Sequence, residues 1–338
     1  MRVYALVSGG VDSSFSLYLL KRKGFDVVSV FLWMYEGQSY VNAEKVSKKL
    51  GAPFLILDVR EEFKREVIKN FIEEYKRGRT PNPCVICNER VKFNLTINKL
   101  LQKEGKIATG HYARIEEKEG RFLLKKSLYK DKDQSYMLYR LKQHELERVI
   151  FPLGNWRKSK VKEKVLKLSL LDEIPPESQD VCFVYGGKNR LLEERIGERE
   201  GLIVHVSGKV LGKHKGIQFF TIGQRSGLNI SWSEPLYVVK IVPEENKVIV
   251  GEKKVAFKKS FVVRDLNWIY FDSPPDVFNA KVKTRYKGEE REGEIRKIGK
   301  ERFKVTLKEE IFAVTPGQSG VFYKDDYVIG GGIIDEVE

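Results

Sequence analysis

The sequence has little cysteine and no long apolar run. Three cysteines among 338 residues are too few, and odd in number, for the disulfide framework of a secreted domain. No stretch of about 18 apolar residues is free of charge, which argues against a membrane-spanning helix. Near the N-terminus only Arg2 is basic and Asp12 interrupts the apolar run, so the pattern of a signal peptide is missing. We therefore expect a cytoplasmic protein that does not bind membranes.

Positive charge is in excess. Lys and Arg number 62 and Asp and Glu 47, which gives a formal net charge of +15. Such an excess favours a polyanionic partner such as nucleic acid or an anionic membrane surface. Hydrophobic residues make up 41% of the chain, enough for packed cores, so the composition excludes a disordered protein. The length is typical of two or three domains.

The first 110 residues alternate apolar runs with helical patterns. Four runs have the composition of strands: residues 3–7, 27–32, 54–57 and 106–109. A helical pattern covers 13–22, and four apolar residues recur at helical spacing: Phe63, Val67, Phe71 and Tyr75. Asp58 precedes Glu61 by three residues, the spacing of a capping box at the start of that helix. This alternation predicts an α/β domain with a parallel sheet covered by helices on both faces.

From about residue 200 the pattern changes to short β-branched and aromatic runs separated by Gly, Pro, Asn and Asp. These runs are residues 201–206, 236–242, 247–250, 260–267, 281–286, 301–307, 319–323 and 327–334. Regular short strands of this kind predict β domains of barrel or sandwich type. We predict three domains, at 1–198, 199–258 and 259–338, with the last division resting on a break at 257–260.

A glycine-rich turn, Ser8-Gly9-Gly10-Val11-Asp12-Ser13, lies between the first strand and the first helix. Glycines let the backbone approach a phosphate, and the helix N-terminus offers unpaired N–H groups. Asp12 suits such a site if a metal ion lies between it and the phosphates. The turn lacks the lysine of a Walker motif and the spacing of a dinucleotide fingerprint. The alternative is an ordinary Gly-Gly turn capped by Ser or Asp.

The cysteines form a second motif, Cys84-x-x-Cys87, with Cys182 95 residues later. Pro81 and Pro83 predict an extended loop before the pair. Cysteine reacts as the thiolate, so we expect a positive neighbourhood supplied by nearby basic residues, namely Arg79, Arg90 and Lys92. The alternatives are half of a structural zinc site or inert buried thiols. Zinc usually takes four protein ligands, and inert thiols would not explain the spacing.

The glycine-rich turn resembles the PP-loop of the ATP pyrophosphatases. Together with the cysteines, five further stretches resemble the tRNA-specific 2-thiouridylase family: residues 108–112, 131–136, 178–183, 221–225 and 315–319. Another RNA-directed PP-loop enzyme, either a lysidine synthetase or a thiolase acting at a different uridine, is an alternative, although lysidine synthesis needs no cysteine pair. A non-catalytic RNA-binding module is a second alternative, against which the intact loop counts.

The resemblance implies a PP-loop α/β domain, a small β-rich middle domain and a C-terminal β-barrel that contacts tRNA. It places ATP on a set of loop residues: Leu6, Val7, Ser8, Gly9, Gly10, Val11, Asp12, Ser13, Leu32 and Gly110. It places the target base against Asn82, Pro83 and Cys84. Cys87 and Cys182 match the catalytic cysteines, with Cys182 as the persulfide carrier. The expected contacts to the anticodon region of tRNA are His111, Lys132, Asp133, Gln134, Arg285, Tyr286 and Gln318.

The resemblance also implies a reaction. ATP and Mg²⁺ would adenylate the C2 carbonyl oxygen of the wobble uridine with release of pyrophosphate. A sulfur nucleophile would then displace AMP. Because the chain itself supplies no sulfur, a persulfide-donating partner protein is expected.

Cys84 departs from the family pattern, since many members carry Asp at this position. Three thiolates without a fourth protein ligand suit a four-iron four-sulfur cluster with one open iron, held by Cys84, Cys87 and Cys182. The alternative is that Cys84 replaces Asp as a polar neighbour of the base, while Cys87 and Cys182 use a persulfide and a disulfide.

The segment 281–304 is strongly basic. It holds ten Lys and Arg against five Asp and Glu, with Tyr286 and Phe303 among them. Basic residues give salt-dependent affinity for phosphates, and aromatic rings suit unstacked bases. A solvated face is the alternative, and the net charge of the whole chain favours RNA.

Overall fold

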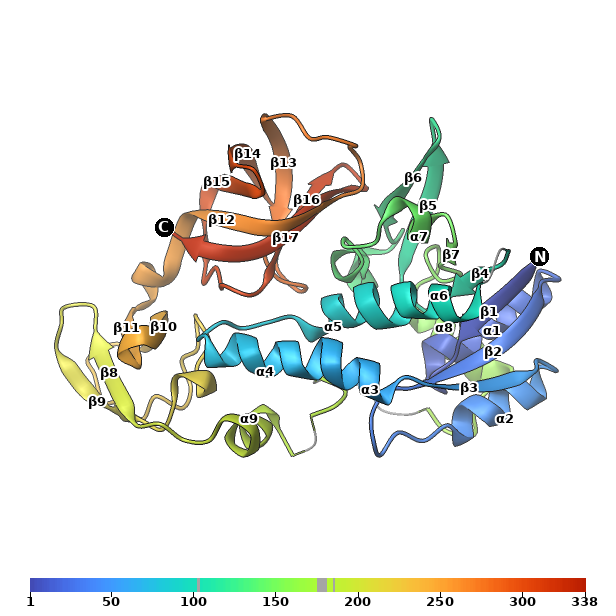
Figure 1. Cartoon of the computed structure of the whole chain (residues 1–338), viewed down its shortest axis with the longest axis horizontal. Helices are drawn as coiled ribbons and strands as arrows, with labels where there is room; N and C mark the ends of the chain where they lie inside the picture. Colours follow the sequence, from blue (N-terminus) through green and yellow to red (C-terminus); the bar gives the residue numbers. More distant parts are fainter. Residues whose placement is uncertain (102–103, 175–180, 185) are drawn as a thin grey trace.

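The structure is a computed structural model that describes residues 1–101, 104–174, 181–184 and 186–338. Ser178, Gln179 and Asp180 of the predicted 178–183 motif lie outside the described residues. Three regions follow one another along the chain: an α/β region, a small β region and a barrel (Figure 1). Within the described ranges, no helix combines the length and apolar character needed to cross a membrane.

The N-terminal region is built on a parallel sheet with strand order β3-β2-β1-β4-β7. Its strands are β1 (Arg2–Leu6), β2 (Asp26–Trp33), β3 (Phe54–Asp58), β4 (Lys106–Ala108) and β7 (Val149–Ile150). The first four are the runs predicted from the sequence, whereas β7 is too short to be recognised. Because parallel strands end at the same edge, the segments after β1, β2 and β4 converge there.

Helices cover both faces of this sheet. One face packs against α1 (Val11–Arg22), α2 (Val41–Lys49) and α8 (Lys158–Lys167). The other packs against a long helix made of α3 (Arg60–Phe63), η1 (Lys64–Ile68) and α4 (Lys69–Lys76). Its predicted apolar face is confirmed, since the four side chains at helical spacing are at most 4% exposed. The predicted capping box is wrong: the N-cap is Val59, although the Asp58 carboxylate accepts a hydrogen bond from the N–H of Arg60.

A second long helix carries the cysteine pair and lies beside the first (Figure 1). It consists of α5 (Pro83–Ile86), η2 (Cys87–Leu95) and α6 (Thr96–Leu100). The prediction of an extended loop up to the cysteines is therefore wrong at Pro83, which is the first helical residue. Proline suits that position because it needs no N–H donor there, and Asn82 caps the helix by accepting a hydrogen bond from Cys84 N (3.2 Å).

The middle region is a four-stranded sheet of order β10-β11-β8-β9. Its strands are β8 (Gly201–His205), β9 (Val210–His214), β10 (Leu236–Val242) and β11 (Lys247–Glu252). The last region contains β12 (Phe257–Trp268), β13 (Val277–Lys283), β14 (Arg291–Gly299), β15 (Arg302–Phe312), β16 (Ser319–Lys324) and β17 (Tyr327–Val337). Pairing of β12 with β17 closes these six strands into a barrel. The predicted fold class is thereby confirmed.

A hairpin of the first region joins the barrel. It comprises β5 (Ala113–Lys118) and β6 (Arg121–Lys126), and Lys125 of β6 pairs with Tyr327 of β17. The remaining helices of the first region and the link to the second are η3 (Lys130–Lys132), η4 (Ser135–Met137), α7 (Gln143–Leu146) and α9 (Lys188–Ile196). The middle region also contains two short helices, η5 (Ile217–Phe219) and η6 (Pro243–Glu245). A third, η7 (Lys253–Ala256), connects β11 to β12. The hairpin holds the barrel against the α/β region.

Candidate active site

The glycine-rich turn leaves β1 at Leu6 and enters α1 at Val11. Gly9 has a φ of +81°, and a Cβ there would lie 2.8 Å from Asn42 Cβ. Only glycine fits this position because both the backbone angle and the neighbouring α2 exclude a side chain. The turn therefore packs closely against α2 while Ser8, Asp12 and Ser13 face the pocket at the carboxyl edge of the sheet.

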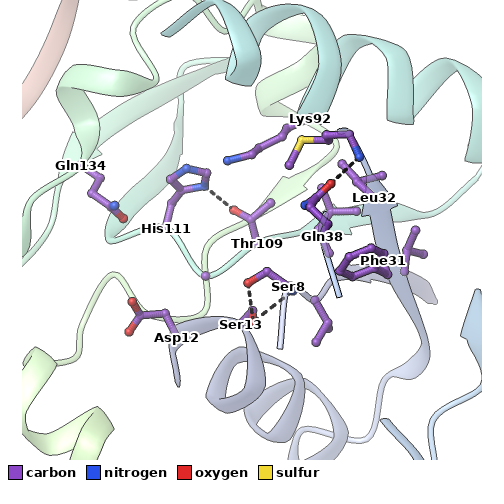
Figure 2. A pocket seen from close by; sticks show the side chains of 15 residues that line it. Ser8, Asp12, Ser13, Phe31, Leu32, Gln38, Lys92, Thr109, His111 and Gln134 are labelled. Carbon is purple, nitrogen blue, oxygen red and sulfur yellow. Dashed lines mark hydrogen bonds between the residues drawn. The ribbon is translucent and has the colours of Figure 1, made fainter. Parts of the chain in front are cut away.

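Two hydroxyls lie at the N-terminus of α1. Ser13 Oγ donates to the carbonyl of Gly10 (3.0 Å) and lies 3.2 Å from Ser8 Oγ, while Ser8 N donates to Ser13 Oγ (3.2 Å). Figure 2 shows both hydroxyls on one side of a pocket, with Lys92 and His111 on the opposite side. The arrangement offers hydrogen-bond donors at the positive end of a helix, which is suited to an anion.

The pocket gathers most of the predicted nucleotide residues. Its lining comprises Leu6, Val7, Ser8, Asp12, Ser13, Val30, Phe31, Leu32, Met34, Gln38, Lys92, Thr109, Gly110, His111 and Gln134. Gly9, Gly10 and Val11 belong to the same turn without lining the pocket. Gly110 has to be glycine, since a Cβ there would lie 2.9 Å from the backbone carbon of Asp12. The two turns, after β1 and after β4, thus touch each other.

Asp12 is the charged group of the turn, and two partners hold it. Its carboxylate accepts hydrogen bonds from Tyr112 Oη (2.6 Å) and from Lys158 Nζ, which lies 2.6 Å from each oxygen. A carboxylate beside a phosphate site suits Mg²⁺, which prefers oxygen ligands. Sequence reasoning missed Lys158. It begins a helix with five lysines, and no pattern distinguishes the one that turns inward.

The three cysteines are free thiols, with Cys87 buried and Cys84 and Cys182 exposed. Burial raises the pKa of the Cys87 thiol to about 12, and partial desolvation raises the pKa of Cys84 and Cys182 as well. In each case the Lys92 ammonium acts in the opposite direction and lowers the thiol pKa. All three thiols therefore lie within the electrostatic reach of one lysine, which also lines the nucleotide pocket.

Arg79, Arg90 and Lys92 are the basic residues expected to surround the thiols, and the expectation is wrong for the two arginines. Arg79 pairs with Glu74 (2.9 Å) and Asp335 (2.7 Å). Arg90 pairs with Glu66 (3.0 Å). These ion pairs neutralise both guanidinium groups, so Lys92 is the member of the predicted set that acts on the thiols.

The described side chains form no site for a single metal ion. Among the described residues, no three His, Cys, Asp or Glu side chains are placed so as to hold one metal ion. A four-iron cluster places each cysteine on a different iron and needs no three ligands around one ion, so the cluster on Cys84, Cys87 and Cys182 stays a prediction.

Two predicted motifs support the loop before the cysteines. Thr80 donates its N–H to Pro316 O (2.9 Å), and its carbonyl accepts from Gln318 Nε2 (2.9 Å). Its hydroxyl lies 3.2 Å from the hydroxyl of Thr221. Gly317, at φ +92°, has no room for a Cβ because Thr80 backbone atoms would lie 3.0 Å away. All three regions of the chain therefore meet at Thr80.

The predicted tRNA contacts fall into three groups. His111 and Gln134 line the nucleotide pocket. Gln318 holds the Thr80 loop, as described above, and Arg285 Nη2 donates to the carbonyls of Phe312 and Ala313. Lys132, Asp133 and Tyr286 line one groove between the first region and the barrel.

That groove, hereafter the hairpin–barrel groove, is rich in lysine. Its lining comprises Lys126, Lys130, Asp131, Lys132, Asp133, Lys283, Tyr286, Lys287, Gly288, Glu289 and Glu290. Asp133 is buried and accepts hydrogen bonds from Ser127 N and Ser135 Oγ (2.8 Å each), so it shapes the wall. Lysines and one tyrosine ring are suited to the phosphates and bases of a single strand.

Much of the basic segment 281–304 is paired within the barrel. Ion pairs join Arg296 to Glu294, Arg302 to Glu336 and Lys304 to Glu338. These charges offset one another along neighbouring strands, whereas Lys283 and Lys287 of the same segment line the hairpin–barrel groove. The groove, rather than the whole segment, is the part suited to RNA.

Comparisons with known proteins cover the whole chain. A family described as "tRNA methyl transferase HUP domain" matches residues 1–186. Families described as "tRNA methyl transferase PRC-barrel domain" and "Aminomethyltransferase beta-barrel domain" match 189–252 and 258–334. The matched ranges follow the three regions of the fold, and the predicted divisions after residues 198 and 258 stay predictions. β12 begins at Phe257, just before the second of them.

Curated relatives match over nearly their full length. A protein of Carboxydothermus hydrogenoformans named "tRNA-specific 2-thiouridylase MnmA" is 41% identical, covering 99% of this chain and 98% of its own. Proteins of the same name from Clostridioides difficile and Clostridium tetani (there "MnmA 1") are each 39% identical. They cover 98% and 100% of this chain, and 97% of their own.

Proposed function

The chain belongs to the tRNA-specific 2-thiouridylase family, and we propose that its nucleotide pocket and its cysteines perform the two halves of uridine 2-thiolation. The chain is thus a tRNA-uridine 2-sulfurtransferase. Two of the matched domain descriptions mention tRNA methyl transfer. Methyl transfer needs neither a phosphate-binding loop nor three thiols around a lysine, so the site favours the chemistry for which the full-length relatives are named.

The observation that carries the proposal is the position of Lys92. It lines the nucleotide pocket, and its charge offsets part of the rise that burial causes in the pKa of all three thiols. Met34 lines the same pocket, and its sulfur lies 4.0 Å from Cys87 Sγ. A base activated by nucleotide in the pocket would therefore lie within reach of a sulfur carried by the cysteines.

In the first half, the uracil O2 attacks the α-phosphorus of ATP and pyrophosphate leaves. The α1 N-terminus and the hydroxyls of Ser8 and Ser13 stabilise the charge that develops on the departing phosphates. Asp12 would hold Mg²⁺, which when bound neutralises part of that charge. The target base must leave the anticodon stack, and we place it against Asn82, Pro83 and Cys84.

In the second half, Cys182 carries a persulfide from a donor protein. Its terminal sulfur attacks C2, the C2–O bond breaks and AMP leaves with the original oxygen. The Cys87 thiolate then attacks Cys182 Sγ, which breaks the S–S bond, releases 2-thiouridine and forms a Cys87–Cys182 disulfide. A dithiol reductant restores both thiols. Burial raises the pKa of the Cys87 thiol to about 12 although Lys92 offsets part of the rise, so Cys87 attacks from the small fraction of thiol that is deprotonated.

Nucleoside mass spectrometry tests the function. We expect tRNA incubated with the chain, ATP, Mg²⁺, a persulfide donor and a dithiol reductant to gain 2-thiouridine at the wobble position, and omission of ATP to prevent it. Absence of 2-thiouridine, or its formation without ATP, would contradict the proposal. We expect the reaction to take place in the cytoplasm, where tRNA is available.

The iron–sulfur hypothesis has its own test through Cys84. Substituting Cys84→Asp restores the residue common in the family. The original protein and the Cys84→Asp variant are both purified without oxygen, and their iron content and visible absorption are compared. If the thiols work without a cluster, as proposed here, both proteins are colourless and Cys84→Asp thiolates tRNA within a few-fold of the original. A brown original protein that loses iron and thiolation on substitution would establish the cluster instead.

A further inference from the structure

A second groove lies where the long helix of α3, η1 and α4 meets α9 and the segment after β2. We call it the helix groove. Its volume is about 620 Å³, against about 200 Å³ for the nucleotide pocket. Met34, Tyr35, Ile68 and Ile72 are its half-buried part, and the other described side chains that line it are charged. An apolar centre with charged surroundings is typical of a surface that binds another protein.

The helix groove reaches the catalytic cysteines through the two residues that follow β2. Tyr35 lines the groove and hydrogen-bonds to the Cys182 thiol. Met34 lines both the groove and the nucleotide pocket, and its sulfur lies 4.0 Å from Cys87 Sγ. One pair of residues thus connects the groove with both catalytic thiols and with the nucleotide pocket.

Packing against the long helix fixes the position of Cys182 beside the groove. The next residue, Phe183, is buried and packs edge-on against Phe63 and Phe71, with ring centroids 5.5 and 5.4 Å apart. Phe63 also contacts the ring of Tyr35, at 5.9 Å. Cys182 itself is exposed. A sulfur donor bound in the helix groove would therefore lie next to an accessible thiol.

The helix groove carries positive charge that the described part of the chain does not neutralise. Lys64, Lys69 and Arg195 are exposed, and none of them has a hydrogen bond or an ion pair with another described side chain. The two other basic residues of the groove are arginines paired with carboxylates. Three such cations face one carboxylate, Glu61, that likewise has no described partner. This charge is complementary to an acidic surface.

The position of the helix groove favours a protein over RNA. In Figure 1, α3, α4 and α9 lie below the helix that carries the cysteine pair, whereas the hairpin β5–β6 and the barrel lie above it. A tRNA held in the hairpin–barrel groove would leave the helix groove open. The described lining of the helix groove also includes three glutamates, which repel phosphates, and its one ring, Tyr35, is engaged with Cys182.

We propose that the helix groove is the docking surface of the sulfur-donor protein, and that an acidic surface around the donor's persulfide binds Lys64, Lys69 and Arg195. This inference rests on the proposed function, in which Cys182 carries the persulfide. The Cys182 thiolate attacks the terminal sulfur of the donor's cysteine persulfide, the donor's S–S bond breaks, and the donor's cysteine leaves as a thiolate. One S–S bond replaces another, so the step consumes no oxidant or reductant.

The test measures the rate of sulfur transfer to Cys182 of the full chain at low salt. The probe is a short peptide whose one cysteine, carried as the persulfide, is flanked by glutamates. Mass spectrometry of the alkylated Cys182 peptide gives the rate. Lys64→Glu with Lys69→Glu should lower it about tenfold or more, because reversed charges repel the acidic probe. With a peptide flanked by lysines instead, the same variant should react faster than the original protein.

The matched control is Lys23→Glu with Lys167→Glu, which changes the net charge equally. Both lysines are exposed, at the ends of α1 and α8 on the other face of the sheet. This control should stay within about twofold of the original with the acidic peptide, since the attraction is local and screened over distance. An equal loss in both variants, or no loss in either, would overturn the docking surface.

Free cysteine persulfide and tRNA separate the remaining outcomes. Cysteine persulfide needs no docking surface, so it should load Cys182 equally in all three proteins, which also shows that the variants are folded. If tRNA affinity falls in Lys64→Glu with Lys69→Glu while transfer from the acidic peptide is unchanged, the groove binds RNA and the proposal is wrong. If no persulfide loads Cys182 of the original protein, the proposed function itself fails.

Discussion

The phosphate loop, residues 8–13, and the cysteine loop, residues 78–87, both lie near Lys92, but they are held in different ways. In the phosphate loop Ser8, Ser13 and Asp12 all have hydrogen-bond partners within the protein. In the cysteine loop the backbone is held at Thr80 by the other two regions. The three cysteines form no disulfide, and Cys84 and Cys182 are exposed.

This difference matches the two chemical tasks. Transfer of a nucleotidyl group depends on fixed dipoles and charges around the phosphates, which a rigid loop provides. A sulfur carrier has to be loaded from outside and then meet a base, which requires accessible thiols. The comparison predicts that a substitution in the phosphate loop impairs adenylation but not the loading of sulfur onto the cysteines. A substitution of a cysteine should impair sulfur transfer but not adenylation.

The largest effect is expected in the phosphate loop. Asp12→Ala and Ser13→Ala should each lower tRNA-dependent ATP–pyrophosphate exchange at least about 100-fold, the usual cost of losing a group that stabilises developing charge. Their affinity for tRNA should stay within a few-fold, since both residues lie in the nucleotide pocket, away from the hairpin–barrel groove. Normal exchange by either variant would remove the nucleotide from this loop.

The hairpin–barrel groove should show an intermediate effect. Lys132→Ala together with Lys287→Ala should flatten the log–log dependence of tRNA affinity on salt by about two units, one for each lost phosphate contact. The matched control is Lys297→Ala with Lys304→Ala, which removes two barrel lysines paired with Asp276 and Glu338. An equal change of slope in both pairs would mean that the groove has no special role.

The smallest effect concerns His111 and acid stability. Desolvation, helped by Lys92, lowers the pKa of His111 to about 3. The unfolded chain binds a proton at this residue below pH 6.5 and the folded chain does not, so stability is lost as the pH falls from 6.5 towards 3.

His111→Gln removes this titration. Between pH 7.5 and pH 5 the variant should lose about 1–2 kcal/mol less unfolding free energy than the original protein. Urea unfolding at the two pH values measures the difference. An equal loss in both proteins would show that His111 titrates normally in the folded state.

The local parts of the fold could be predicted from the sequence. Strands β1 to β4 and the helix that carries Phe63 and Val67 follow from runs and periods a few residues long. The hairpin β5–β6 pairs with β17 about 200 residues later, and no local pattern records that pairing. The missed hairpin is what brings the barrel to the active site.

The candidate site divides in the same way. Ser8 to Ser13 and the cysteine pair are contiguous motifs. Ser8 and Ser13 line the nucleotide pocket, and Cys87 Sγ lies 4.0 Å from the sulfur of Met34, which lines the same pocket. Lys158 is one lysine among five in its helix, and its burial depends on packing against α1. The neutralisation of Arg79 by Asp335 joins residues 256 positions apart and could not be foreseen from neighbouring charges.

The most direct test of the two-loop account is Cys182→Ser, assayed for both partial reactions on the same sample. ATP–pyrophosphate exchange in the presence of tRNA should stay within about threefold of the original, because the phosphate loop is intact. Mass spectrometry of the tRNA nucleosides should find no 2-thiouridine, because the sulfur carrier is missing. Loss of exchange together with thiolation, or 2-thiouridine formed without Cys182, would contradict the division of the site into two loops.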